Sequence, residues 1–182
     1  MTKDNLVESL WLQKLDASRK RKDEFFATDH ESPLHHQAPS KFAGLKYFVP
    51  DRKYTVAAKL QRYKNPETVT MITSKGTKQR FQRVGYFEFE IDGKKVGLQA
   101  YRSAEREDDE LLLPFRDGTS DKESYGASRY LDLELTKDDN YVIDFNFAYN
   151  PYCAYSEDYV CPLPPRENWL DIEIRAGEKN YH

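Results

Sequence analysis

From residue 44 onwards, the chain consists mostly of short segments that are rich in β-branched and aromatic residues. Such segments are typical of β-strands, and the Gly, Pro, Asn and Asp clusters between them are typical of turns. Many short strands in sequence predict a mainly β (α+β) fold, an antiparallel β-barrel or sandwich. The expected strands include GLKYFVP, KYTVAAKLQRY, ETVTMITS, RFQRVGYFEFEIDG, KKVGLQAYR, ELLLPF, RYLDLELT, YVIDFNFAY and WLDIEIRA.

The residues before these strands differ in pattern. Residues 4–27 are predicted to form one helix, because Val7, Leu10 and Trp11 recur on one face. Residues 28–43 carry Ser32-Pro33 and little periodicity, and are expected to form a connector. We expect the helix to pack on a β-rich core, 44–182, so that residues 1–182 form a single domain.

Composition narrows the classes of function. The 28 basic and 31 acidic residues are evenly mixed and give a net charge of −3, which does not favour nucleic acid as a partner. The sequence contains no run of 18 apolar residues, the length that a membrane-spanning helix needs. Charged residues also interrupt the N-terminal segment, where a signal peptide would need an apolar run. The chain is therefore expected in the cytoplasm, with its two cysteines reduced and no obligatory disulfide.

Two hairpins can be placed in register. Asp92-Gly93 predicts a two-residue turn that pairs Glu90 with Lys95 and would also set two apolar pairs opposite each other. A five-residue loop, 136–140, would form the second hairpin. Its apolar face would pair Leu135 with Tyr141, Leu133 with Ile143 and Leu131 with Phe145.

The other face of the second hairpin would carry polar residues. Asp132 would lie directly opposite Asp144, and Tyr130 opposite Asn146. Opposed carboxylates destabilise a sheet unless an arginine, another cation or a shared proton offsets them. Arg129 could supply that charge. A solvated outer face, or a bulge that shifts the register, would explain the pair without a site.

The cysteines and glycines show no established motif. Cys153 and Cys161 are eight residues apart, which is neither a redox C-x-x-C nor a zinc spacing, so packing thiols and a nucleophilic Cys153 both remain open. Asp117, Asp121 and Glu123 fail the calcium-loop pattern. Neither a metal site nor a cofactor nor an oligomeric state is specified by these residues.

Several longer stretches together resemble one known family. SYGASRYLDLEL, DFNFAYNPYCAYSEDYVCPLPPRENWL and AGEK are similar to the prokaryotic family catalogued as domain of unknown function 1684, and RKDEFF, GLKYFVPD and LLLPFRDGTS fit it too. The resemblance implies no known activity. It implies that a set of mostly polar residues is important in this protein: Arg129, Tyr130, Asp144, Asn146, Tyr149, Asn150, Cys153, Cys161, Glu167 and Asn168.

These residues predict a polar pocket at one end of the β-rich core, capped by a loop over 149–168. Arg129 would bind the anionic group of an unidentified small molecule, Asp144 and Asn146 would orient it, and Asn150 would hold the loop. The remaining candidates, with Tyr149 and Tyr155 as walls, are Tyr130, Asp132, Cys161, Glu167 and Asn168. In an enzyme, Asp144 would be the acid–base and Cys153 the nucleophile.

A non-catalytic role is the alternative. The same polar residues could staple the loop to the core, with Arg129 and Asp144 as a buried ion pair and the asparagines bonded to loop backbone. The tyrosine-rich loop could also receive a protein partner.

Overall fold

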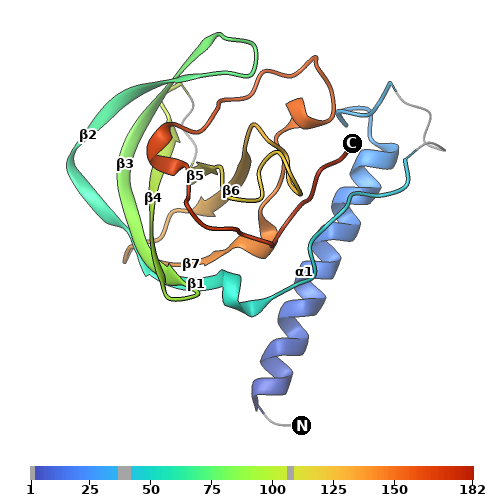
Figure 1. The fold of residues 1–182 in the computed structure, drawn as a ribbon, viewed down its shortest axis with the longest axis horizontal. Coiled ribbons are helices and arrows are strands. Elements are labelled where there is room, and N and C mark those ends of the chain that lie inside the picture. The colour runs from blue at the N-terminus through green and yellow to red at the C-terminus, as the bar shows by residue number, and fades with distance from the viewer. Residues whose placement is uncertain (1–2, 37–41, 106–108) are drawn as a thin grey trace. The chain divides into compact units, whose positions relative to one another are not determined.

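The structure, a computed structural model, describes residues 3–36, 42–105 and 109–182. Within these residues it contains one α-helix and two antiparallel sheets, of five strands (β2-β3-β4-β5-β6) and two strands (β1-β7) (Figure 1). Contacts divide the chain into two compact units, 1–46 and 47–182. The strands are β1 (Thr55–Lys59), β2 (Gln61–Ile72), β3 (Lys78–Ile91), β4 (Lys94–Ser103), β5 (Glu110–Phe115), β6 (Arg129–Glu134) and β7 (Asn140–Asp144).

The first unit is built around helix α1. It runs from Lys3 to Thr28, which confirms the helix predicted at 4–27. After it, the backbone turns back: Ser32 Oγ donates to the carbonyl of Phe26 at 3.0 Å and accepts from the Leu34 amide at 3.1 Å. Residues 37–41 of the predicted connector lie outside the described residues. Neither α1 nor any other described helix combines the length and apolarity needed to cross a bilayer.

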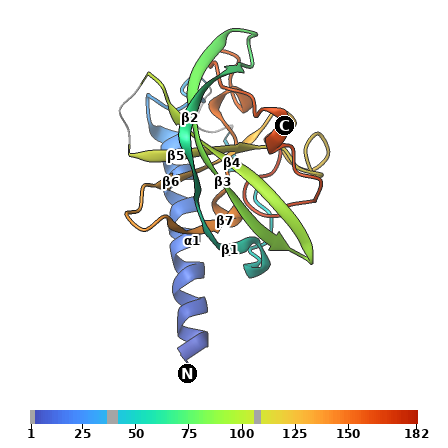
Figure 2. The ribbon, with the colours of Figure 1, turned by 90° about the vertical axis from the view of Figure 1, so that its left-hand side faces the viewer.

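The two sheets of the second unit share one hydrophobic core. Phe87, Leu98 and Leu113 from the large sheet and Ile143 from the small sheet are all 0% exposed within one cluster. Figure 2 shows the long strands β2, β3 and β4 curving together. Within the described residues the strands form two sheets and do not close into a barrel. The antiparallel, mainly β fold is therefore confirmed, in its sandwich form.

The first predicted hairpin is confirmed. β3 and β4 pair Glu90 with Lys95, Phe89 with Val96 and Phe87 with Leu98. Both turn residues have positive φ, 50° at Asp92 and 75° at Gly93, as a type I′ turn requires. A two-residue turn leaves the strands no other register, which is why local sequence was sufficient here.

The second predicted hairpin is wrong. β6 pairs with β5, so that Asp132 lies opposite Leu112, whereas β7 pairs with β1, so that Asp144 lies opposite Thr55. The loop between them bonds outward instead, because the Asp139 carbonyl accepts from Leu60 and the Leu135 amide donates to Asp109. Neighbouring strands pair only about two-thirds of the time, and each strand here finds an apolar partner elsewhere.

Two predicted strands are irregular. In 44–50 only Tyr47 forms a bridge, with Glu178, and in 169–176 only Trp169 does, with Arg116. The second segment is held by a few backbone bonds and one side chain: the Leu170 amide donates to the Arg116 carbonyl at 2.8 Å, and the Ile174 amide donates to the carboxylate of Asp117 at 2.6 Å. Such isolated bonds bury apolar residues without a continuous strand ladder, and alternation alone does not reveal this.

Candidate functional site

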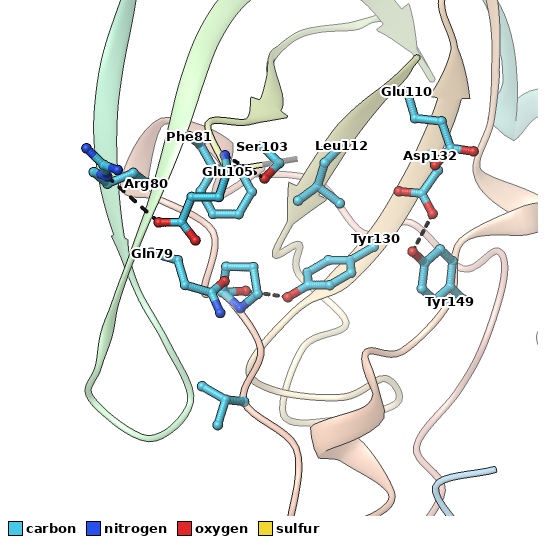
Figure 3. A pocket seen from close by; sticks show the side chains of 12 residues that line it. Gln79, Arg80, Phe81, Ser103, Glu105, Glu110, Leu112, Tyr130, Asp132 and Tyr149 are labelled. Atoms are coloured by element: carbon cyan, nitrogen blue, oxygen red, sulfur yellow. Dashed lines mark hydrogen bonds and ion pairs between the residues drawn. The ribbon is translucent and has the colours of Figure 1, made fainter. Parts of the chain in front are cut away.

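A cavity of about 490 Å³ lies at the end of the large sheet. β3 and β4 contribute one side of it, β5 and β6 its floor, and the segment after β7 a third side (Figure 3). We call it the tyrosine cavity, after Tyr130 and Tyr149. Its other lining residues are Gln79, Arg80, Phe81, Ser103, Glu105, Glu110, Leu112, Asp132, Val160 and Pro162.

Strand alternation places the floor of this cavity. On β5 and β6 the odd-numbered residues Leu111, Leu113 and Leu131 are at most 3% exposed in the core. The even-numbered residues therefore face outward. Asp132 sits opposite Leu112 in the ladder, and Tyr130 sits two residues before it on the same face. The polar floor is thus the outward side of two strands whose other side is apolar except for Arg129 at the start of β6.

The third side is fastened to the sheet by backbone bonds. Tyr130 and Tyr149 exchange two backbone hydrogen bonds, at 2.8 and 3.0 Å, and the Leu163 amide donates to the Ile72 carbonyl at 2.8 Å. The Tyr130 hydroxyl also donates to the carbonyl of Pro162 (Figure 3). The predicted capping loop, 149–168, thus supplies one wall of the cavity.

Among the described residues that line the cavity, carboxylates outnumber cations. Three of these residues, Glu105, Glu110 and Asp132, are acidic, and one, Arg80, is a cation that lies 3.8 Å from Glu105. The hydroxyl of Tyr149 donates to Asp132 (Figure 3). Burial and the neighbouring Asp132 charge raise the pKa of Tyr149, so this phenol stays protonated. Burial likewise raises the pKa of Tyr130.

Arg129, which was expected to bind a ligand, is enclosed by the protein. Its side chain is 1% exposed and pairs with Asp117, whose side chain is 0% exposed, at 3.1 Å. The guanidinium also donates to the carbonyls of Ile174 (2.8 Å), Ala176 and Glu178 (3.3 Å). The alternative prediction that Arg129 pairs with Asp144 was wrong, because Asp144 ends β7, which lies in the other sheet. This cation therefore ties the C-terminal segment to β6.

Asp144 and Asn146 form a separate group that bonds to backbone. One oxygen of Asp144 accepts from the amide and the side chain of Asn146, at 3.0 and 2.8 Å, and so caps the 3₁₀ turn Phe145–Phe147. Asn146 in turn accepts from the Asp51 amide at 3.0 Å and donates to the Asp51 carbonyl at 2.9 Å. Neither residue lines the tyrosine cavity.

Asn150 and Tyr155 meet a buried carboxylate that the sequence reading did not single out. Glu178 is 1% exposed and accepts from the Asn150 amide at 2.8 Å and from the Tyr155 hydroxyl. Asn150 also donates to Lys179 at 2.8 Å. Burial and the Glu178 charge raise the pKa of Tyr155. The AGEK stretch, which ends in Glu178-Lys179, was the sequence signal for this contact.

Asn168 and Glu167 fasten the far end of the loop. The Asn168 side chain is 0% exposed, accepts from the Gln99 amide at 2.8 Å, and donates to the carbonyls of Gln99 and Pro114 at 3.0 and 2.8 Å. Glu167 accepts from Tyr101 at 3.1 Å and pairs with Arg83 at 3.3 Å. Both residues serve the fold and lie outside the tyrosine cavity.

The two cysteines, although not in a known motif, lie together. Both are free, Cys153 half-buried in the 3₁₀ turn Tyr152–Ala154 and Cys161 buried. Their thiols interact with each other, and this interaction lowers the pKa of Cys153 and raises that of Cys161. The described part of the chain holds no group of three or more His, Cys, Asp or Glu that could bind a metal ion.

The geometry thus brings Tyr130, Asp132 and Tyr149 together in one cavity, and Cys153 and Cys161 together in one pair. Asp144 and Asn146 bond to each other, but Arg129 pairs with Asp117 instead of with either of them. Sequence reasoning missed Asp117, Glu178 and the cavity residues of β3 to β5. Their positions depend on strand order, which the sequence did not indicate; the LLLPFRDGTS and AGEK stretches, which contain Asp117 and Glu178, only resembled the family.

Comparisons with known proteins agree with this fold. The family described as protein of unknown function (DUF1684) matches residues 40–179. The solution NMR structure of the uncharacterised protein from gene locus rrnAC0354 of Haloarcula marismortui is 40% identical, covers 97% of each chain and superposes with a TM-score of 0.73. No curated protein matches the chain. With a match across most of its length, the chain belongs to the family of proteins of unknown function called DUF1684.

Proposed function

We propose that the tyrosine cavity binds a small organic cation. The observation that carries the proposal is the charge of the described residues that line the cavity. Among them the carboxylates Glu105, Glu110 and Asp132 exceed the one guanidinium, that of Arg80, beside the rings of Tyr130 and Tyr149. Carboxylates attract an ammonium group directly, and aromatic faces attract it through their quadrupole. A volume of about 490 Å³ is in the range of small-molecule sites.

The charge of this ligand is opposite to the one expected from the sequence. That expectation rested on Arg129, whose donors are directed to Asp117 and to backbone carbonyls inside the protein. The carboxylates of the cavity are spread over β5, β6 and the residues that follow β4. This spread suits a ligand with two separated amino groups better than a single compact ion.

Putrescine, a four-carbon diamine, is the probe that tests the proposal. Isothermal titration calorimetry at low salt should show it binding, while succinate and butane-1,4-diol, of the same length but negative and neutral charge, should not bind. Asp132→Asn should weaken binding about tenfold, which corresponds to about 1.4 kcal/mol. Added salt should weaken it further, because the cavity is partly open to solvent.

Glu88→Gln is the matched control. Glu88 is an exposed carboxylate on β3 that does not line the cavity, so its loss changes the net charge equally. Its effect should stay below about twofold, because charges beyond a Debye length of about 8 Å are screened. Binding of succinate in place of putrescine, or equal effects of the two substitutions, would overturn the proposal.

The polar residues outside the cavity support a second role, which is structural. Asn146, Asn150 and Asn168 each bond to backbone groups of distant segments. We infer that they staple the loop and the C-terminal segment to the sheets, as buried polar groups require partners. We assign no acid–base step to Asp144, since its carboxylate caps a turn. Thermal unfolding of the variants, described below, tests this role.

A further inference from the structure

Three segments converge on the thiol pair formed by Cys153 and Cys161. The hydroxyl of Tyr125 lies 3.8 Å from Cys153 Sγ and 3.4 Å from the carbonyl oxygen of Cys153. On the other side, Ser74 and Cys161 exchange two hydrogen bonds, at 2.8 and 3.2 Å. The pair is therefore held by the loop before β6 and by the turn between β2 and β3, and does not depend on the 149–168 loop alone.

The two thiols differ in exposure and in charge. Cys153 is half-buried, whereas Cys161 is buried. The hydrogen bond from Cys161 is the main cause that lowers the pKa of Cys153, and bonds from Tyr125 and Ser74 act in the same direction. The bond to Cys153 and burial together raise the pKa of Cys161. Cys153 is thus the more accessible of the two sulfurs and loses its proton more readily, whereas Cys161 lies buried and holds its proton more strongly.

This asymmetry is what thiol–disulfide exchange needs. The attacking sulfur must be a thiolate that solvent can reach, and a second thiol must lie within reach to resolve the mixed disulfide. We propose that Cys153 and Cys161 form a redox-active dithiol that is oxidised to an intramolecular disulfide by low-molecular-weight disulfides. Cys153 is the attacking residue and Cys161 the resolving residue.

The reaction balances in two steps. The Cys153 thiolate forms a bond to one sulfur of the external disulfide, whose S–S bond breaks and releases one thiolate. Cys161 then gives up its proton and attacks Cys153 Sγ; the bond between Cys153 and the external group breaks, and the second thiolate leaves and takes up that proton. Two electrons pass from the protein dithiol to the external disulfide, which ends as one thiolate and one thiol; the thiolate takes up from water the proton that Cys153 lost when it ionised.

The test uses the full chain and oxidised glutathione, without any amine ligand. Intact-mass spectrometry should show the native protein losing the mass of two hydrogen atoms, with little glutathione adduct, and peptide mapping should join Cys153 to Cys161. Cys161→Ala should instead accumulate one glutathione on Cys153. Cys153→Ala should react at least about tenfold more slowly, because the buried, protonated thiol is a poor nucleophile.

Circular dichroism before and after oxidation shows whether the folded protein reacted. A stable glutathione adduct in the unsubstituted protein, or oxidation seen only after unfolding, would overturn the proposal. Equal reaction rates of Cys153→Ala and Cys161→Ala would do so as well. Because the assay contains no putrescine, its result is independent of whether the tyrosine cavity binds a cation.

Discussion

Asp117→Asn should strongly destabilise the protein, because it removes the charge that balances Arg129. The two side chains are 0% and 1% exposed, so water cannot replace the lost partner. Besides Arg129, Asp117 accepts from the amide of Ile174 at 2.6 Å and from the Thr119 hydroxyl at 3.0 Å. One carboxylate therefore joins β6, the loop after β5 and the C-terminal segment.

The magnitude follows from the burial of the pair. Breaking a buried ion pair by removing one partner costs about 3–5 kcal/mol, since the other charge stays uncompensated. For a domain of this size, each kcal/mol lowers the melting temperature by about 2–4 °C, so the expected loss is about 6–20 °C. Urea unfolding followed by circular dichroism measures the free energy directly.

Asp144→Asn is the matched comparison, because Asp144 was the partner of Arg129 expected from the sequence. Its side chain caps the turn Phe145–Phe147, and asparagine caps such turns about as well as aspartate. The cost should therefore stay below about 1 kcal/mol. If Asp144→Asn destabilises the protein as much as Asp117→Asn, the assignment of the buried ion pair is refuted.

A double variant separates the ion pair from its surroundings. Arg129→Met removes the cation, so adding Asp117→Asn should cost about 1–3 kcal/mol less than it does alone. The recovery is incomplete, because the carbonyls of Ile174 and Glu178 lose their donor as well. Strict additivity of the two substitutions would contradict direct pairing.

Three further outcomes are expected. Iodoacetamide should alkylate Cys153 at a rate that stays high at neutral pH and falls as the pH drops through the lowered pKa of Cys153. Cys161→Ala should raise the midpoint of this pH profile towards the ordinary thiol pKa of about 8.5. An unchanged midpoint would contradict the interaction between the two thiols. Asn168→Ala should cost about 2–4 kcal/mol in urea unfolding, because three buried backbone groups lose a partner; a cost under about 1 kcal/mol would show that water replaces the amide. Gly177→Ala should lower the melting temperature, because the φ of Gly177 is +75° and an added Cβ would lie 2.4 Å from the Ala148 carbonyl oxygen. A melting temperature that stays unchanged, as for an ordinary surface substitution, argues against this close approach.

Local sequence was sufficient wherever a few consecutive residues decide the structure. Helix α1 follows from its own residues, and the β3–β4 register follows from Asp92-Gly93, whose positive φ angles admit one tight turn. The polar residues that the 144–168 stretch brought to attention include side chains with several bonds to distant segments, as Asn168 has to Gln99 and Pro114. Their individual partners did not follow from that stretch.

Tertiary structure decided which distant segments meet. The alternation of β6 and β7 suited a hairpin, yet β6 pairs with β5 and β7 with β1, because an apolar face accepts any apolar partner of matching period. With that pairing, Arg129 lies against Asp117 and Asp132 lies on the floor of the tyrosine cavity. The approach of Cys153 to Cys161 likewise depends on how their loop packs against distant segments. Periodicity records which side of a strand is buried, whereas the neighbour across the ladder is selected by packing of the whole core.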